Sequence, residues 1–483
     1  MEQNSQLVFP TYRNFRNAQR QHVHGYEYVE VEPSTKTEQL YEFELSSANP
    51  LAFGVATGFR VEGVFQCKGK EATDAWVNVP ADDSKIVTLQ QNWWDHYVKQ
   101  VDVFYGNNPV NQDDMPPFIN AYINAFMYAH MHKGIKKLLC MEECHPGRSV
   151  SVNHGNYKAR GSTSTTTDDW TAYSKTVFNK DSVSFLYTPL HVFPFYQDVN
   201  YVYGENGGFN VLPLQTMGKL QVRVFFREDS SILFNKVDTN EKTYRFVLNK
   251  MTLLLKEVRL APSVARSMAS AKGTYLYRGL TKVAVTENVR GSDFTHRSTF
   301  PGIDMPEGIF IFCLDKTVLS GRAKFQDLSL DGTFKAHNIA SCDVHFNGQH
   351  FYAKGPNFGH PGHFQIQREN FAKLVSRGPF GMLMDPDALT FERQGVHHDW
   401  SFPCVWLDLT ESSPHTRLQT VHSDVNYMTN KMGDLTVVMN FESPNGAVDA
   451  LYVVVAYYTD TNLQLDMRTK KFYPVYNKNK IIN

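Results

Sequence analysis

Short apolar runs, rich in Val, Phe, Tyr, Ile and Thr, alternate with turn residues along the whole chain. In the first half they include YEYVEVE, QLYEFELS, FRVEGVFQCK, SVSFLYTPL and KLQVRVFFRE. In the second half the pattern returns in YLYRGLTKVAVTEN, GIFIFCLD, LTVVMNF and ALYVVVAYY. Runs of β-branched and aromatic residues between turn residues predict strands. Around Phe59, Val61, Val64 and Phe65 the pattern predicts a strand that is covered on one face only.

Two segments show helical spacing instead. In residues 113–134 an apolar face follows Pro116 and Pro117 and ends at Gly134, as expected for a helix with proline in its first turn. Residues 363–379, HFQIQRENFAKLVSRGP, end in Gly and Pro, which stop a helix. Many strands with a few short helices in their loops predict an all-β sandwich of jelly-roll or Greek-key type.

Two short sequences from the first half recur in the second half, in the same order. MGKLQVRVFF at residues 217–226 returns as MGDLTVVMNF at 432–441, with five identical letters in register. Upstream of each, VDVFYGNN at residues 101–108 returns as CDVHFNGQ at 342–349. The first copy is longer by 26 residues, which fit the Gly/Ser/Thr-rich residues 148–173 as a loop. The repeated order predicts two tandem copies of one domain type.

The length of 483 residues suits two domains of roughly 200 to 250 residues, a size that β sandwiches often reach. The small-residue stretch LAPSVARSMASAKG is suited to a linker between them. The predicted division is an N-terminal arm at residues 1–24, a first domain at 25–259, the linker at 260–273, a second domain at 274–466 and a C-terminal basic tail at 467–483.

Composition and charge narrow the functional classes. Aromatic residues are 13% and charged residues 20% of the chain, which is typical of a folded protein. A net charge of −1 argues against a dominantly basic nucleic-acid binder, so any contact with a genome must be local. The start, MEQNSQLVFP, lacks the pattern of a signal peptide, and the longest apolar runs fall short of the ~18 residues of a membrane span. We expect a soluble chain folded inside a cell, with its six cysteines reduced.

The sequence lacks three common catalytic or phosphate-binding motifs. Neither G-x-S-x-G, G-x-x-x-x-G-K-[ST] nor H-E-x-x-H occurs. A pair of converging carboxylates, as in a glycosidase, stays open because the fold decides which carboxylates meet. Groups of metal-ligating residues are close only in sequence and match no closed four-ligand zinc pattern: His22 with His24, His130 with His132, Cys140 with Cys144 and His145, and His397 with His398. We predict no catalytic residue, no cofactor and no metal site.

Both ends of the chain carry basic residues interleaved with aromatic ones. The basic residues are Arg13, Arg16 and Arg20 near the start, and Arg468, Lys470, Lys471, Lys478 and Lys480 near the end. Such segments can contact phosphates without sequence preference and gain affinity from counterion release. The alternative is that they are solvated or packing arms.

Several stretches together resemble a known family. EYVEVEPSTKTEQLYEFELS, NWWDHYVKQVDVFYGNNPV and PPFINAYINAF in the first half, the FPGIDMPEGIFIFCLD stretch through its NGQ turn, and the closing ALYVVVAYYTDTNLQLDMRTKK are similar to double jelly-roll major capsid proteins of the Polinton/Maverick and adintovirus group, which are hexon-like. The resemblance runs from about Glu27 to Lys471. It implies two tandem eight-stranded jelly rolls.

The resemblance also implies a role. Three chains would form a homotrimeric, pseudo-hexameric capsomer in the icosahedral shell of a double-stranded DNA virus or virus-like element, so the protein would be located in the virion. Its partners would be other copies of itself, penton proteins, and minor capsid or cement proteins. The basic termini would lie on the inner side and contact DNA or an inner membrane. No residue would be catalytic.

Two other classes stay open beside the capsid hypothesis. A tandem jelly-roll hydrolase would need carboxylates that converge between the rolls, and no motif supports one. A viral spike or other receptor-binding protein would normally have a single roll, which the repeated sequences disfavour.

Overall fold

The computed structural model describes the strands and their nearest connections. The described residues are 23–45, 52–71, 73–85, 87–89, 93–105, 108–111, 177–178, 180–187, 189, 192, 195, 212–214, 220–228, 230–236, 242–263, 273–300, 308–315, 339–346, 348–350, 405–408, 433–445, 451–466 and 471–475. The two predicted helices at 113–134 and 363–379 and the predicted loop at 148–173 lie outside them. Within the described ranges, no helix is both long enough and apolar enough to cross a bilayer.

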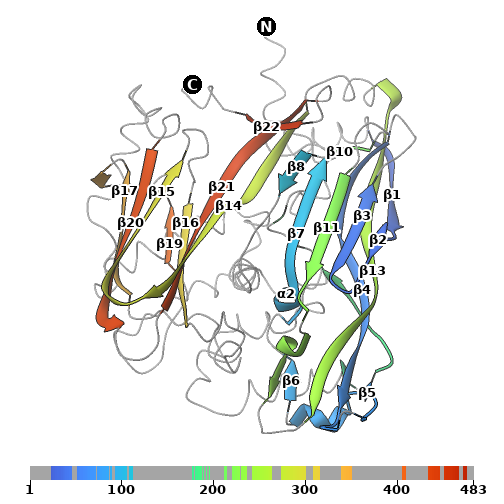
Figure 1. Cartoon of the computed structure of the whole chain (residues 1–483). Coiled ribbons are helices and arrows are strands. Elements are labelled where there is room, and N and C mark those ends of the chain that lie inside the picture. The colour runs from blue at the N-terminus through green and yellow to red at the C-terminus, as the bar shows by residue number, and fades with distance from the viewer. Residues whose placement is uncertain are drawn as a thin grey trace, which may run out of the picture.

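The first half of the chain forms two antiparallel sheets that pack face to face (Figure 1). One sheet has the order β1 (Val23–Val31), β13 (Thr243–Leu260), β4 (Ala52–Lys68) and β10 (Leu212–Pro213), with β5 (Val77–Asn78) and β9 (Val183–Tyr187) also paired to β4. The other has the order β2 (Thr35–Lys36), β3 (Leu40–Leu45), β11 (Leu220–Phe226), β7 (Val98–Tyr105) and β8 (Asn108–Asn111).

Short elements close one end of this first sandwich. A two-stranded ribbon pairs β6 (Val87–Leu89) with β12 (Phe234–Lys236). The helix α2 (Trp93–Tyr97) leads directly into β7, and two 3-10 turns, η2 (Ala81–Lys85) and η5 (Ser230–Leu233), lie beside the ribbon. The described helices are therefore short and lie in the connections, as the sequence predicts.

The second half forms another pair of antiparallel sheets. One has the order β14 (Gly273–Val289), β21 (Leu451–Asp466), β16 (Gly308–Asp315) and β19 (Val405–Asp408), and β22 (Lys471–Val475) also pairs with β21. The other has the order β15 (Gly291–Phe300), β20 (Gly433–Asn445), β17 (Ile339–Phe346) and β18 (Gln349–His350).

The two sandwiches have the same topology. If the eight main strands of each half are numbered along the chain, one sheet has the order 1-8-3-6 and the other has the order 2-7-4-5. The eight are β1, β3, β4, β7, β8, β9, β11 and β13 in the first half, and β14 to β21 in the second. This is the strand order of a jelly roll, in which two Greek keys wrap around one core. The predicted fold class, two tandem jelly rolls, is confirmed.

Alternating side chains build the core of the first roll. In β11 every second residue is buried, and β3 and β7 supply the buried partners from the same sheet. Aromatic rings fill the space between the sheets, because Phe65 contacts Trp93, Phe178, Phe234 and Phe246 at centroid distances of 5.0 to 5.9 Å. Rings of this size each bury a large apolar area, which is the main favourable term in folding. The buried aromatic residues of this roll therefore stabilise its interior.

The buried residues of the second roll form a separate cluster. It contains Ile309 and Ile311 from β16, Val344 from β17, Val437 from β20 and Val455 from β21, all 0% or 1% exposed. Aromatic residues make up a smaller share of this cluster than of the cluster in the first roll. Each roll therefore has a core of its own among the described residues.

Gly63 provides a test of packing in the first roll. It lies on β4 at a shift in register, where β13 pairs Leu248 with Gly63 and Lys250 with Glu62. A Cβ atom at Gly63 would lie 2.2 Å from Cζ of Phe246 and 2.6 Å from the carbonyl oxygen of Val247. We expect Gly63→Ala to lower the free energy of unfolding of this roll by about 1 to 3 kcal/mol, the usual cost of overpacking.

Urea unfolding followed by intrinsic fluorescence measures this effect. Gly25→Ala is the matched control, because Gly25 is also in a strand and a Cβ there meets nothing within 4 Å. Equal unfolding midpoints for the two variants would contradict the close contact at Gly63.

Candidate functional site

The repeated sequences form the same pair of strands in each roll. In the first roll β11 pairs with β7, matching Leu220 with Tyr105, Val222 with Val103 and Val224 with Val101. In the second roll β20 pairs with β17, matching Leu435 with Phe346, Val437 with Val344 and Met439 with Cys342. When the repeated sequences are aligned, these pairs fall at the same positions. The repeated sequences therefore form the same strand pair, with the same register, in both rolls.

The inward positions of this strand pair explain why it is repeated. Leu220, Val222 and Val224 are fully buried in the first roll. Leu435, Val437 and Met439 are fully buried in the second. Because side chains alternate between the faces of a strand, these positions all point into a core. The repetition maintains the core and leaves the outer face free to differ.

The outer faces of the two strand pairs have indeed diverged. In the first roll Arg223 on β11 binds Glu42 on β3 at 3.1 Å, and its guanidinium lies 4.8 Å from the ring centre of Phe104 on β7. In the second roll the position of Arg223 is Val438, and the position of Phe104 is His345. The charged and aromatic group of the first roll is thus replaced by a histidine site in the second.

A tight hairpin places this histidine. β17 and β18 are joined by the two residues Asn347 and Gly348, and Gly348 has a φ of +80°. Asn-Gly is the usual sequence of a two-residue hairpin turn, since such turns need positive φ. The turn pairs Phe346 with Gln349 and therefore His345 with His350. Directly opposed residues have Cβ atoms about 4.5 to 5.5 Å apart, so the two imidazoles are neighbours.

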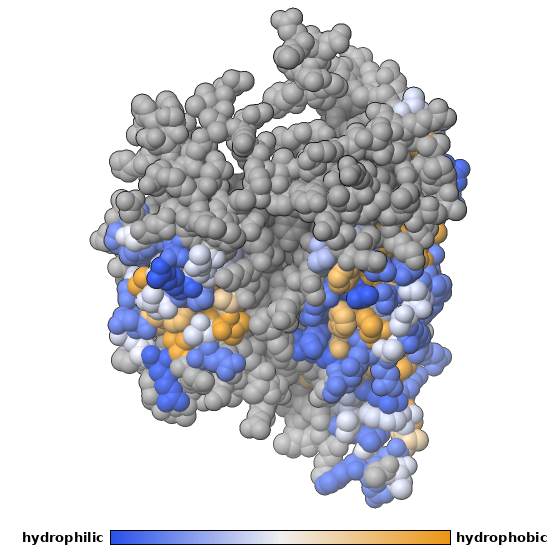
Figure 2. Space-filling view, turned by 45° about the horizontal axis from the view of Figure 1, so that its top comes forward, coloured by the Kyte–Doolittle hydropathy of each residue, from blue (hydrophilic) through white to orange (hydrophobic). Residues whose placement is uncertain are grey.

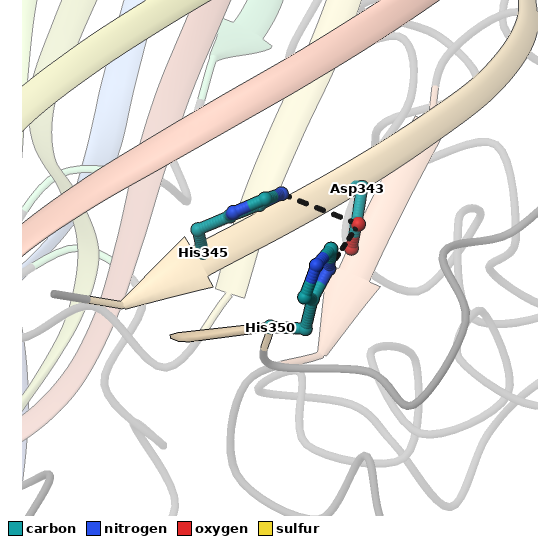
Figure 3. Close-up of side chains that lie close together, drawn as sticks. All are labelled: Asp343, His345 and His350. Carbon is teal, nitrogen blue, oxygen red and sulfur yellow. Dashed lines mark hydrogen bonds and ion pairs between the residues drawn. The ribbon is translucent and has the colours of Figure 1, made fainter. Parts of the chain in front are cut away.

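Asp343 completes the group, which we name the Asp343–His345–His350 cluster. It lies two residues before His345 on β17 and so faces the same side of the sheet. Nδ1 of His350 donates to Oδ2 of Asp343 at 2.7 Å, and Nε2 of His345 lies 3.3 Å from the same oxygen. Figure 3 shows the two rings approaching the carboxylate from the two strands of the hairpin. The ring centroids are 4.2 Å apart.

The cluster lies at the surface but is partly covered. The side chains of Asp343 and His345 are 21% and 25% exposed, and that of His350 is 60% exposed. Oδ1 of Asp343 accepts a hydrogen bond from the backbone amide of Val344 at 2.8 Å. That bond fixes the carboxylate, so that Oδ2 points to both imidazoles. One carboxylate and two imidazoles with converging atoms can hold a proton or a metal ion.

The neighbouring strand of the same sheet carries a second charged group. Asp434 on β20 accepts hydrogen bonds from Thr299, at 2.6 Å, and from Arg297, both on β15. These two donors hold the pKa of the Asp434 carboxyl below its usual value. The outer face of this sheet therefore combines paired charges with the cluster.

The sequence pattern alone does not predict the cluster. The histidine groups named from the sequence are adjacent or nearly adjacent along the chain, whereas His345 and His350 are brought together by the hairpin. The signal that could have found them is the Asn-Gly turn, which has histidine two residues before it and two residues after it. The side chains of the histidine and cysteine groups named from the sequence lie outside the described part of the chain. They are His22, His24, His130, His132, Cys140, Cys144, His145, His397 and His398. The two cysteines whose side chains are described, Cys67 and Cys342, are buried thiols.

The basic termini lie mostly outside the described residues. This holds for Arg13, Arg16, Arg20, Arg468, Lys470, Lys478 and Lys480. Lys471 is the first residue of β22 and pairs with Asp466 on β21. β22 also contacts β8 of the first roll, beside which it lies in Figure 1. Part of the predicted basic tail is thus a strand at the boundary between the rolls, and genome contact by the tail stays a prediction.

Few large apolar side chains among the described residues are exposed to solvent. Figure 2 shows hydrophilic and hydrophobic residues mixed over both rolls in that view. Among the described residues, Tyr28 and Val77 are the large apolar side chains that are exposed, at 61% and 53%. Both belong to the first roll.

Comparisons with known proteins find similar solved structures but no similar sequence family. No protein-family model and no curated protein matches the chain. A chain in the cryo-EM structure of the Sputnik virophage matches with 11% identity and a TM-score of 0.54, over 96% of this chain and 91% of that chain. The mavirus major capsid protein has 9% identity and a TM-score of 0.49, over 93% and 90%. The Faustovirus major capsid protein has 9% identity and a TM-score of 0.47, over 95% of each chain.

The match to the Sputnik chain extends over nearly the whole of both chains. It therefore includes both rolls and their arrangement in sequence. The double jelly-roll fold that the sequence resemblance implies is confirmed.

Gly348 tests how the hairpin builds the cluster. A φ of +80° disfavours residues with a Cβ, so we expect Gly348→Ala to lower the free energy of unfolding by about 1 kcal/mol. Gly348→Asn should cost less, because asparagine adopts positive φ more readily. The thermal unfolding midpoints of the two variants provide the comparison. A larger loss for the asparagine variant would show that the turn does not depend on this backbone conformation.

Proposed function

We propose that this chain is a major capsid protein. Three copies would form a pseudo-hexameric capsomer in the icosahedral shell of a double-stranded DNA virus or virus-like element of the Polinton/Maverick–adintovirus type. The observation that carries the proposal is the duplicated roll, with one strand order and one register, in a fold that matches a virophage chain over almost its full length. The sequence resemblance supports the same class.

The duplication suits this role for a geometric reason. A hexagonal array of capsomers needs six similar lobes around each centre. One chain with two equivalent rolls supplies six lobes from three copies, so threefold symmetry gives a sixfold outline. Because the outer faces of the rolls differ, as at Arg223 and Val438, the six lobes would be similar in shape but not identical in their contacts.

We also propose the division of the chain given by its sequence: an arm at 1–24, rolls at 25–259 and 274–466, a linker at 260–273 and a tail at 467–483. The strand bounds agree with it to within two residues, since β1 begins at Val23, β13 ends at Leu260 and β14 begins at Gly273. β22 occupies residues 471–475 of the tail. The arm and the rest of the tail would contact DNA or an inner membrane, and the outer surfaces would meet neighbouring capsomers, penton proteins and cement proteins.

The role we infer is structural and not enzymatic. This inference rests on the fold, which a chain of a virus particle shares.

The oligomeric state tests the capsomer. We expect the purified protein to have three times the mass of the 55.2 kDa chain, because the trimer is the unit that presents six rolls. Native mass spectrometry gives the mass, and negative-stain electron microscopy gives the outline, which should have six lobes. A protein that stays monomeric over the concentration range used for assembly would contradict the proposal.

The basic termini make a separate prediction. We expect Arg13, Arg16, Arg20 and Lys470, all changed to Ala, to reduce the DNA content per particle while particle yield is kept. In unassembled protein the same change should weaken DNA binding and reduce its salt dependence, by a log–log slope of about 0.9 for each phosphate that is no longer neutralised.

A charge-matched control separates position from charge. Arg60, Lys250, Arg259 and Arg297 are exposed but paired with carboxylates in the rolls. Changing these four to Ala removes the same formal charge from other places. Unchanged packaging in the terminal variant, or an equal loss in the control, would contradict a role for the termini.

A further inference from the structure

We propose that the Asp343–His345–His350 cluster binds one divalent transition-metal ion of the zinc class. The three side chains each offer one ligand atom, and these atoms all lie within 4.8 Å of one another. Two imidazole nitrogens and one carboxylate oxygen are a ligand set that Zn²⁺ accepts, and Co²⁺ and Ni²⁺ accept similar sets. Ca²⁺ and Mg²⁺ prefer oxygen ligands alone, so the two nitrogens disfavour them.

The two distances from the carboxylate to the imidazoles need little change to admit the ion. Ligands about 2.0 to 2.1 Å from a tetrahedral zinc ion lie roughly 3.3 Å from one another. Nε2 of His345 is already 3.3 Å from Oδ2 of Asp343. Nδ1 of His350 is 2.7 Å from that oxygen, a distance that its proton now bridges. The ion would take the place of this proton, and the 60% exposed ring of His350 has room to rotate.

The backbone holds the ligands in advance. The Asn-Gly turn fixes His345 opposite His350, and the pairing of β17 with β20 fixes Asp343 and His345 on one strand. The amide of Val344 binds Oδ1 of Asp343 and leaves Oδ2 for the ion. An orienting partner of this kind strengthens metal binding, because less freedom is lost when the ion arrives.

The first roll shows that the fold alone does not require these residues. Its equivalent hairpin pairs Phe104 with Pro109 and carries Asp102 at the position of Asp343. Asp102 is buried there and accepts a hydrogen bond from Gln100 at 2.7 Å. The hairpin keeps its aspartate in both rolls, but only the second has the two histidines. The proposal therefore gives one ion for each chain.

Three protein ligands leave the fourth position open, as in sites that exchange a ligand. The exposure of His350 places that position toward solvent, so water would fill it. A site of this kind is weaker than a closed four-ligand site and does not hold the fold together. Removing the ion should leave the unfolding midpoint of the rolls almost unchanged.

Cobalt titration of the protein, purified without a polyhistidine tag and freed of metal by a chelator, tests the site. We expect one equivalent of Co²⁺ per chain to give a visible d–d absorption that Zn²⁺ displaces. The double variant His345→Gln with His350→Gln should lose this signal, and Asp343→Asn should weaken binding by about tenfold or more. The variant His397→Gln with His398→Gln removes two histidines elsewhere in the sequence and should keep the signal.

A second measurement needs no variant. Zn²⁺ should protect His345 and His350 of the wild-type protein from diethyl pyrocarbonate, with the modified sites identified by mass spectrometry. Equal loss of cobalt binding in the two double variants, or unchanged reactivity of His345 and His350 when Zn²⁺ is added, would overturn the proposal. The cluster would then be a pair of carboxylate–imidazole contacts without a metal.

Discussion

The register between the seventh and fourth strands of each roll decides which side chains reach the core. A shift of one residue would turn every inward side chain of β11 or β20 to the outside, because side chains alternate between the two faces of a strand. Leu220, Val222 and Val224 and their counterparts in β20 make such a shift very costly, since all are buried. The hairpins β7–β8 and β17–β18 each continue from one strand of this pair, so the register of the pair determines where the hairpin residues lie.

Much of the fold could be predicted because its signals are local. Alternating apolar residues mark β3, β4 and β11 individually, and the repeated sequences mark the same strand pair twice. The Asp343–His345–His350 cluster could not be predicted in the same way, because it needs the hairpin register as well as the residue types. The packing of Trp93 and Trp94 was also missed. Their burial depends on sheets whose strands are far apart in sequence, including β9 and β13.

The two rolls show which features a duplicated domain keeps. The inward residues of the repeated strand pair are similar, whereas the residues on its outer face include Arg223 and Phe104 in one roll and Val438 and His345 in the other. The described parts of the cores differ too, since aromatic residues make up a larger share of the buried cluster in the first roll than in the second. The strand order is thus more similar between the two rolls than the side chains that fill their cores. This agrees with the tolerance of cores for substitutions that keep volume and pattern.

The strand β22 has a mechanical consequence. After the second roll the polypeptide comes close to β8 of the first, so the two lobes contact one another at β22 as well as being joined through residues 261–272. Lobes tied by a single tether swing relative to one another unless their interface is large. A second point of contact restricts that motion, so we expect the two lobes to move less freely than lobes joined by the tether alone. The residues that follow Val475 start beside this contact, and a segment added there would begin between the lobes.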